Sequence, residues 1–156
     1  MNYSECIEQA RKRIGNYCKA CPECNGKACR NQMPGPGSKG IGDTAIRNYD
    51  KWKEIRLQMD TIAENKPVDT SLELFDKTFQ YPFFAGPVGA VQLHYGDCQT
   101  DVTYNDILVS ACAEYGIAAF TGDGIDSNVM VAATKAIQKT DGIGIPTVKP
   151  VSYTHL

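Results

Sequence analysis

Four cysteines in one short stretch are the sharpest chemical signal in the sequence. Cys18, Cys21, Cys24 and Cys29 are separated by two, two and four residues. The Asn25-Gly26 pair between them is typical of a turn, so the segment should fold back on itself and gather the thiols. Two-residue spacings are typical of cysteines that ligate iron–sulfur clusters, and four thiolates also suit a structural zinc ion. The spacing predicts a metal site in which both remain open, against the alternative of a reduced cysteine-rich turn without metal.

Two glycine-bearing corners form a second candidate site. Gly86-Pro87-Val88-Gly89 and Thr121-Gly122-Asp123-Gly124 each follow a short apolar run that resembles a strand. In sheets of parallel strands, ligands bind at the carboxyl ends of the strands, which is where both corners fall. The backbone of Pro87-Val88-Gly89 could therefore support a planar cofactor, with Thr121 offering a hydroxyl. Turn formation alone is the competing interpretation for each corner.

A catalytic set of side chains is not evident in the sequence. His94 is one of two histidines and could act as a general base, because its pKa suits proton transfer near neutral pH. A single loop histidine is more often structural or solvated. No serine–histidine–aspartate or cysteine–histidine arrangement can be assembled around it.

Length and composition indicate a water-soluble protein with one core. The chain has 156 residues, of which 42% are hydrophobic and 22% are charged, with a formal net charge of −2. Such a charge gives no reason to expect nucleic acid or an anionic membrane as a partner. The sequence shows neither an apolar run of the ~20 residues needed to span a membrane nor a secretory signal. We therefore expect a cytoplasmic protein whose seven cysteines stay reduced.

The N-terminal third is expected to be helical and separate from the rest. An amphipathic pattern predicts a helix over Ser4–Lys19, and a glycine- and proline-rich segment occupies residues 33–42. A second helix should begin at Asp43 or Thr44, both of which are good N-caps. We predict two domains: a helical cysteine-rich segment with its linker over residues 1–42, and a second domain over residues 43–156.

Downstream of residue 70 the pattern changes to alternating strands and helices. We expect a hairpin over Ser71–Phe79, a fully buried strand over Pro82–Ala85 and a polar loop over Val91–Thr100. Two helix–strand pairs should follow: a helix from Asp101 or Thr103 to Tyr115, a strand at Ile117–Phe120, a helix from Asp126 or Ser127 to Lys139 and a strand at Gly142–Val148. The first helix should turn Ile107, Leu108, Ala111 and Cys112 inward, and the second Val129, Met130, Ala133 and Ile137. This alternation predicts an α/β fold with parallel βαβ units.

Three motifs in this order resemble the FMN-dependent 2-hydroxy-acid oxidase and dehydrogenase family. They are Arg47-Asn48-x-x-x-Trp52, Phe83-Phe84-Ala85-Gly86-Pro87-Val88-Gly89 and Ala118-Ala119-Phe120-Thr121. The resemblance runs from about Asp43 to Pro150 and implies the N-terminal portion of a (β/α)8 TIM barrel, with about three βα units. The cysteine segment lies outside it.

The resemblance implies FMN as cofactor and oxidation of a small 2-hydroxy acid to the 2-oxo acid. It places Pro87-Val88-Gly89 beside the flavin ring and Thr121 in contact with FMN. The family's catalytic histidine, with its arginine and lysine partners, belongs to later strands, so we expect no catalytic residue here and an inactive, truncated chain. Assembly of the full-length protein into a homo-oligomer is left open. The alternative function is an iron–sulfur or zinc-binding module for electron transfer or structural support.

Overall fold

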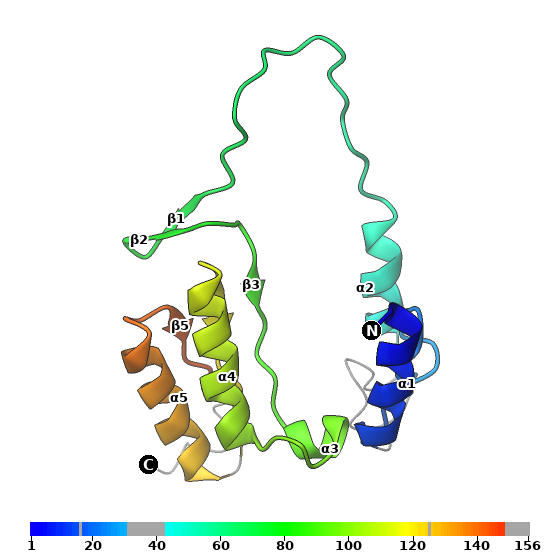
Figure 1. Cartoon of the computed structure of the whole chain (residues 1–156), viewed down its shortest axis with the longest axis vertical. Helices are drawn as coiled ribbons and strands as arrows, with labels where there is room; N and C mark the ends of the chain where they lie inside the picture. The colour runs from blue at the N-terminus through cyan, green and yellow to red at the C-terminus, as the bar shows by residue number, and fades with distance from the viewer. Residues whose placement is uncertain (16, 31–42, 125, 149–156) are drawn as a thin grey trace. The chain divides into compact units, whose positions relative to one another are not determined.

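The computed structural model describes residues 1–15, 17–30, 43–124 and 126–148. The chain forms two compact units (Figure 1). The first comprises Met1–Asn65 with Gln92–Cys98, and the second comprises Lys66–Val91 with Gln99–Leu156. The glycine- and proline-rich segment at residues 33–42 lies outside the described residues, and the predicted domain boundary at residue 42 stays a prediction.

The first helix, α1, spans Tyr3–Arg13 and is shorter than the predicted Ser4–Lys19. It starts one residue earlier than expected, because the Asn2 side chain accepts a hydrogen bond from the Glu5 N–H and the Glu5 side chain accepts one from the Asn2 N–H. None of its residues is buried, so the expected apolar stripe is not packed into a core.

The early end of α1 has a local cause. Ile14 adopts an extended backbone, and the Gly15 N–H donates to the carbonyl of His94 over 3.2 Å. The α-carbon of Gly15 lies so close to the Leu93 carbonyl that a β-carbon there would be 2.4 Å from its oxygen. This contact with a segment distant in sequence replaces the helical hydrogen bonds that the local pattern predicted.

The second helix, α2, spans Thr44–Trp52 and begins where the sequence predicted. Asp43 is its N-cap residue, although the Asp43 side chain makes no capping hydrogen bond. Residues 55–70 contain neither helix nor strand and are exposed. Five large apolar side chains of this segment face solvent: Ile55, Leu57, Met59, Ile62 and Val68.

The second unit contains the predicted hairpin and a parallel sheet. Strands β1 (Leu72–Leu74) and β2 (Lys77–Phe79) pair antiparallel, as expected. Strands β3 (Phe84–Ala85), β4 (Ala118–Phe120) and β5 (Gly144–Ile145) are parallel in the order β3-β4-β5. The parallel βαβ arrangement and the mixed α/β class are therefore confirmed.

Among the described residues, three helices lie between β3 and β5 in the sequence, and one of them, the short α3 (Val91–Tyr95), belongs to the first unit except for its first residue. Helix α4 (Asp101–Glu114) and helix α5 (Ser127–Lys139) match the predicted pair, and α3 occupies part of the predicted loop. The loop prediction was wrong there, because Val91 is buried and starts a helical turn that the polar residues around it did not indicate. No helix in the described part of the chain is both long and apolar enough to cross a membrane.

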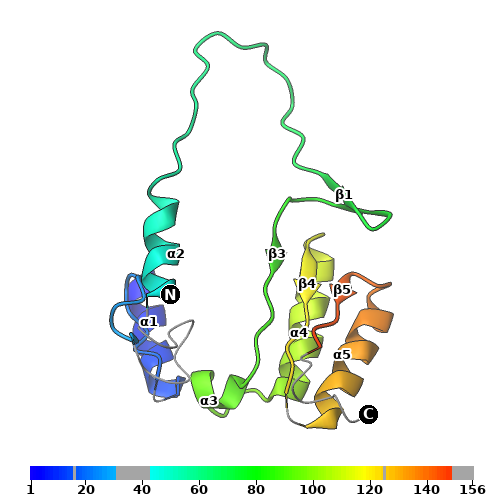
Figure 2. The same cartoon turned by 180° about the vertical axis from the view of Figure 1, so that it is seen from behind.

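The core lies between one face of the sheet and helices α4 and α5, which run side by side against it (Figure 2). Its centre consists of Val109, Cys112, Ala119 and Ala136. The predicted inward face of α4 was therefore partly wrong, since Ile107 is 50% exposed. Similarly, α5 buries Val129, Ala133 and Ala136, whereas Ile137 is only partly buried.

The opposite face of the sheet is not covered in this way. Phe84 is 58% exposed, so the predicted full burial of this strand was wrong. Its ring lies 5.1 Å from the ring of Phe120 on the neighbouring strand. Ala85, by contrast, faces the helices and packs against the core. A continuous apolar run indicated burial on both faces, but among the described residues only one face meets helices.

Candidate functional site

The two glycine corners and the segment after β5 all leave the same edge of the sheet. Ala85 pairs with Ala119, and Ala119 pairs with Gly144, so the three parallel strands end nearly in line. Residues 86–90 follow β3, residues 121–124 follow β4 and residues 146–148 follow β5. This edge is where parallel sheets present their ligand sites.

The two corners interlock through their backbones. A β-carbon on Gly122 would lie 1.8 Å from the carbonyl oxygen of Val88, and one on Gly89 would lie 2.6 Å from the carbonyl oxygen of Asp123. Only glycine permits both approaches without displacing the other loop. The structure thus brings Val88, Gly89 and the Thr121-Gly122 pair together, as the sequence predicted. Their role as flavin contacts stays a prediction.

Exposure differs among the predicted cofactor contacts. Pro87 is exposed, Val88 and Gly89 are half-buried, and Thr121 is fully buried. The Thr121 hydroxyl accepts a hydrogen bond from the Thr147 N–H over 3.2 Å. Thr121 therefore joins the second loop to the third in this structure, and residues 87–89 are the less buried part of the predicted site.

Two side chains that the sequence analysis missed hold the corners in place. Asn105 on α4 is 1% exposed, and its Oδ1 accepts from the Gly122 N–H over 2.8 Å. One turn earlier, the Asp101 carboxylate accepts from the Val91 N–H over 2.8 Å. Asn105 also occupies the face of α4 that buries Val109 and Cys112. A polar residue at the spacing of that buried face was the signal that could have identified it.

The four cysteines lie in a loop without regular secondary structure, not in a helix. All are free thiols, and the Cys29 S–H donates to the Gly26 carbonyl over 3.8 Å. Partial burial of the Cys24 thiol raises its pKa. The negative charges that Cys29, Cys18 and Cys21 carry when ionised raise the pKa of Cys24 further. The four thiols thus share one neighbourhood.

That neighbourhood does not form a recognisable metal centre. Within the ranges that the structure describes, which include all four cysteines, no group of three or more His, Cys, Asp or Glu side chains is arranged to hold a metal ion. The geometry therefore gives no support to the iron–sulfur or zinc prediction, which still depends on the spacing alone.

His94 belongs to the first unit, whereas both glycine corners belong to the second. Its Nδ1 atom is buried and meets no hydrogen-bond partner among the described residues. The His94 ring lies 5.9 Å from that of Tyr95. These contacts do not assign it a catalytic role.

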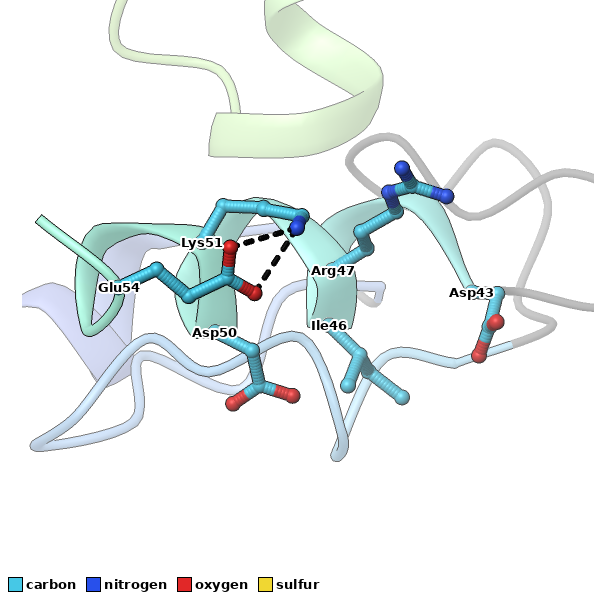
Figure 3. Close-up of a pocket in the computed structure, with 6 residues that line it drawn as sticks. All are labelled: Asp43, Ile46, Arg47, Asp50, Lys51 and Glu54. Atoms are coloured by element: carbon cyan, nitrogen blue, oxygen red, sulfur yellow. Dashed lines mark hydrogen bonds and ion pairs between the residues drawn. The ribbon is translucent and has the colours of Figure 1, made fainter.

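A charged hollow of about 200 Å³ lies along α2 (Figure 3). Its lining consists of Asp43, Ile46, Arg47, Asp50, Lys51 and Glu54. The Lys51 ammonium and the Glu54 carboxylate in it form an ion pair of 2.7 Å. Both side chains are more than half exposed, so the pair adds little stability.

Comparison with known proteins gives one result. The model of a protein family described as FMN-dependent dehydrogenase matches residues 36–142. No curated protein and no solved structure matches the chain significantly. The matched region includes α2, both glycine corners and helices α4 and α5, and it excludes the four clustered cysteines.

Proposed function

The chain belongs to the FMN-dependent dehydrogenase family, and on this premise we propose that it supplies the flavin-binding part of an enzyme that oxidises a small 2-hydroxy acid to the 2-oxo acid. Family membership supports an FMN-dependent oxidoreductase in general. The 2-hydroxy acid is our more specific proposal, and it is based on the order of motifs in the sequence.

The proposed cofactor site is the backbone of Pro87, Val88 and Gly89. Two observations support the fit of a flat ring there. Residues 87–89 are exposed or half-buried, and Gly89 and the carbonyl of Val88 are held against Asp123 and Gly122, which leaves the loop little freedom to shift. Thr121 would fix the start of the second corner, because its hydroxyl holds the backbone of Thr147 and the next residue, Gly122, lies against Val88.

The chain's own contribution is binding and orientation. When bound, FMN supplies the two-electron acceptor for the hydroxy acid. The interlocked corners would hold the ring at the carboxyl edge of the sheet and shield one of its faces from water. We propose no residue of this chain as the base that takes the substrate proton.

We also propose that the parallel unit is part of a (β/α)8 barrel. On the face of the sheet that meets the helices, paired positions of the three strands carry small residues, namely Ala85, Ala119 and Gly144. Larger side chains, such as Phe84 and Phe120, lie on the opposite face. In such barrels helices cover the outside and bulky side chains fill the interior. The observed distribution supports that orientation.

The observation that carries the proposal is the contact between Gly122 and Val88, and FMN titration of the purified chain tests it. We expect quenching of flavin fluorescence and a yellow protein after removal of free flavin, because a ring held against backbone is shielded from solvent. Riboflavin, which has the same ring but lacks the phosphate, is the matched ligand control and should also be quenched, because the proposed contact is with the ring. A chain that is folded by circular dichroism but leaves the fluorescence of FMN unchanged would contradict the proposal.

A further inference from the structure

Two polar side chains on the N-terminal half of α4 reach the two corners. Asp101 accepts the N–H of Val91, which follows the first corner, and Asn105 accepts the N–H of Gly122 in the second. They are four residues apart and therefore lie one above the other on the same side of the helix. A single rigid element thus sets the spacing between the two loops.

Asn105 uses both halves of its amide. Its Oδ1 accepts from the Gly122 N–H over 2.8 Å, and its Nδ2 donates to the Asp101 carbonyl over 2.9 Å. The residue is 1% exposed, so water cannot replace either bond. A leucine would leave the Gly122 N–H buried without an acceptor. An ionised aspartate would keep the acceptor but would present a second oxygen to the Asp101 carbonyl instead of a donor.

The position of Gly122 matters because its α-carbon lies directly against the Val88 carbonyl. Any shift of Gly122 must therefore move the backbone beside it. We propose that Asn105 is a positioning residue for FMN, which acts by holding Gly122 against Val88 and so fixes the surface formed by residues 87–89. This inference depends on the proposed function for the identity of the ligand, but the hydrogen bonds that carry it do not.

The test compares Asn105→Leu and Asn105→Asp with Ser110→Ala in the full chain. Ser110 is on the same helix, and its hydroxyl is buried without a hydrogen-bond partner among the described residues, so its removal should change FMN affinity less than about twofold. Asn105→Leu should weaken FMN binding about tenfold or more, because a buried donor loses its acceptor. Equal affinities for Asn105→Leu and the wild type would overturn the inference.

The aspartate variant adds a pH profile that a merely structural role would not produce. At low pH its protonated carboxyl can both donate to the Asp101 carbonyl and accept from Gly122, as the amide does. The charged groups on the segments around it include Asp101, one turn earlier on α4, and Asp123, which follows Gly122, while Lys139 of α5 pairs with Asp106 over 3.3 Å. We expect the ratio of the FMN dissociation constant of Asn105→Asp to that of the wild type to rise about tenfold as the introduced carboxyl ionises. A ratio independent of pH would contradict this role.

Hydrogen exchange separates this inference from the proposed function. The Gly122 amide should exchange at least about tenfold faster in Asn105→Leu than in the wild type, and at the wild-type rate in Ser110→Ala. If the wild-type chain does not bind FMN, the proposed function fails and the exchange result still decides whether Asn105 positions the loop. If FMN binds and the Gly122 amide keeps its protection in Asn105→Leu, the positioning role fails alone.

Discussion

Replacing Gly122 with alanine is the most direct perturbation of the interlocked corners. The added β-carbon would lie 1.8 Å from the carbonyl oxygen of Val88 and 2.8 Å from its carbonyl carbon. Both are backbone atoms, so no side-chain rotation can relieve the overlap. The φ angle of Gly122 is not in the left-handed region, so the cost in the folded state comes from this collision and not from backbone strain.

The cost follows from the distance that the loop must move. The Val88 carbonyl has to retreat by roughly 1.6 Å or more to reach ordinary contact, and overpacking of this kind typically costs about 1–3 kcal/mol. For a chain of this length, 1 kcal/mol corresponds to about 2–4 °C in Tm, so the variant should melt roughly 2–12 °C below the wild type. FMN affinity should fall as well, because the retreating carbonyl belongs to the proposed cofactor surface.

Gly86→Ala is the matched control for this experiment. It lies in the first corner, yet a β-carbon there would meet nothing within 4 Å, and its φ angle is also outside the left-handed region. Its Tm should be unchanged or slightly higher, because alanine restricts the unfolded chain more than glycine does. Thermal unfolding by circular dichroism and FMN titration are measured on both variants. If Gly122→Ala melts and binds FMN as Gly86→Ala does, the loops are not interlocked as described.

Two further predictions concern the cysteines. Burial raises the pKa of the Cys112 thiol, so its contribution to stability is complete below the pKa of the unfolded thiol, about 8.5, and is lost as pH rises through the higher folded value. Between pH 8 and 10 the Tm should therefore fall more steeply for the wild type than for Cys112→Ala, and equal slopes would refute this assignment. The cysteine spacing predicts zinc or iron in chain purified without oxygen, and less of either in Cys21→Ser/Cys24→Ser. Elemental analysis checks this, and wild-type protein without either metal would end the prediction.

Elements with strong local signals were predictable from the sequence. Asp126 caps α5 by accepting from the Asn128 N–H, and Gly116 ends α4 with a φ of +66°. Both are decided by residues within a few positions of each other, so one sequence contains the information. The hairpin β1–β2 belongs to the same class, because its alternating pattern and its turn are contiguous.

Features decided by distant residues were not predictable in the same way. The end of α1 depends on the contact between Gly15 and the carbonyls of residues 93–94. Full burial of the strand at Phe84 was expected from its composition, but burial depends on what covers each face of the sheet. Local pattern reports whether a residue is apolar, whereas tertiary structure decides which apolar residues are buried.

In the candidate site, too, local features were predictable from the sequence and long-range contacts were not. The glycines of both corners were predictable from the sequence, because they follow apolar runs that resemble strands. The proximity of the two corners followed from the common carboxyl edge of parallel strands. The hydrogen bonds of the supporting residues were not predictable, because Asn105 and Asp101 act across 17 and 10 residues of sequence. The spacing of Asn105 relative to Val109 and Cys112 could have indicated its burial, but not its partner. The types of Asn105 and Asp101 alone would have suited a solvated helix surface equally well.

The row Ala85, Ala119 and Gly144 constrains how this protein can vary. A β-carbon on Gly144 would lie 2.6 Å from the Ile137 side chain, so the layer between strands and helices has no room for larger groups. On the reverse side Phe84 is 58% exposed among the described residues, and in the proposed barrel that side would be the interior that large side chains fill. Neighbouring positions of β3 should therefore select opposite sizes, with small residues at Ala85 and large ones at Phe84.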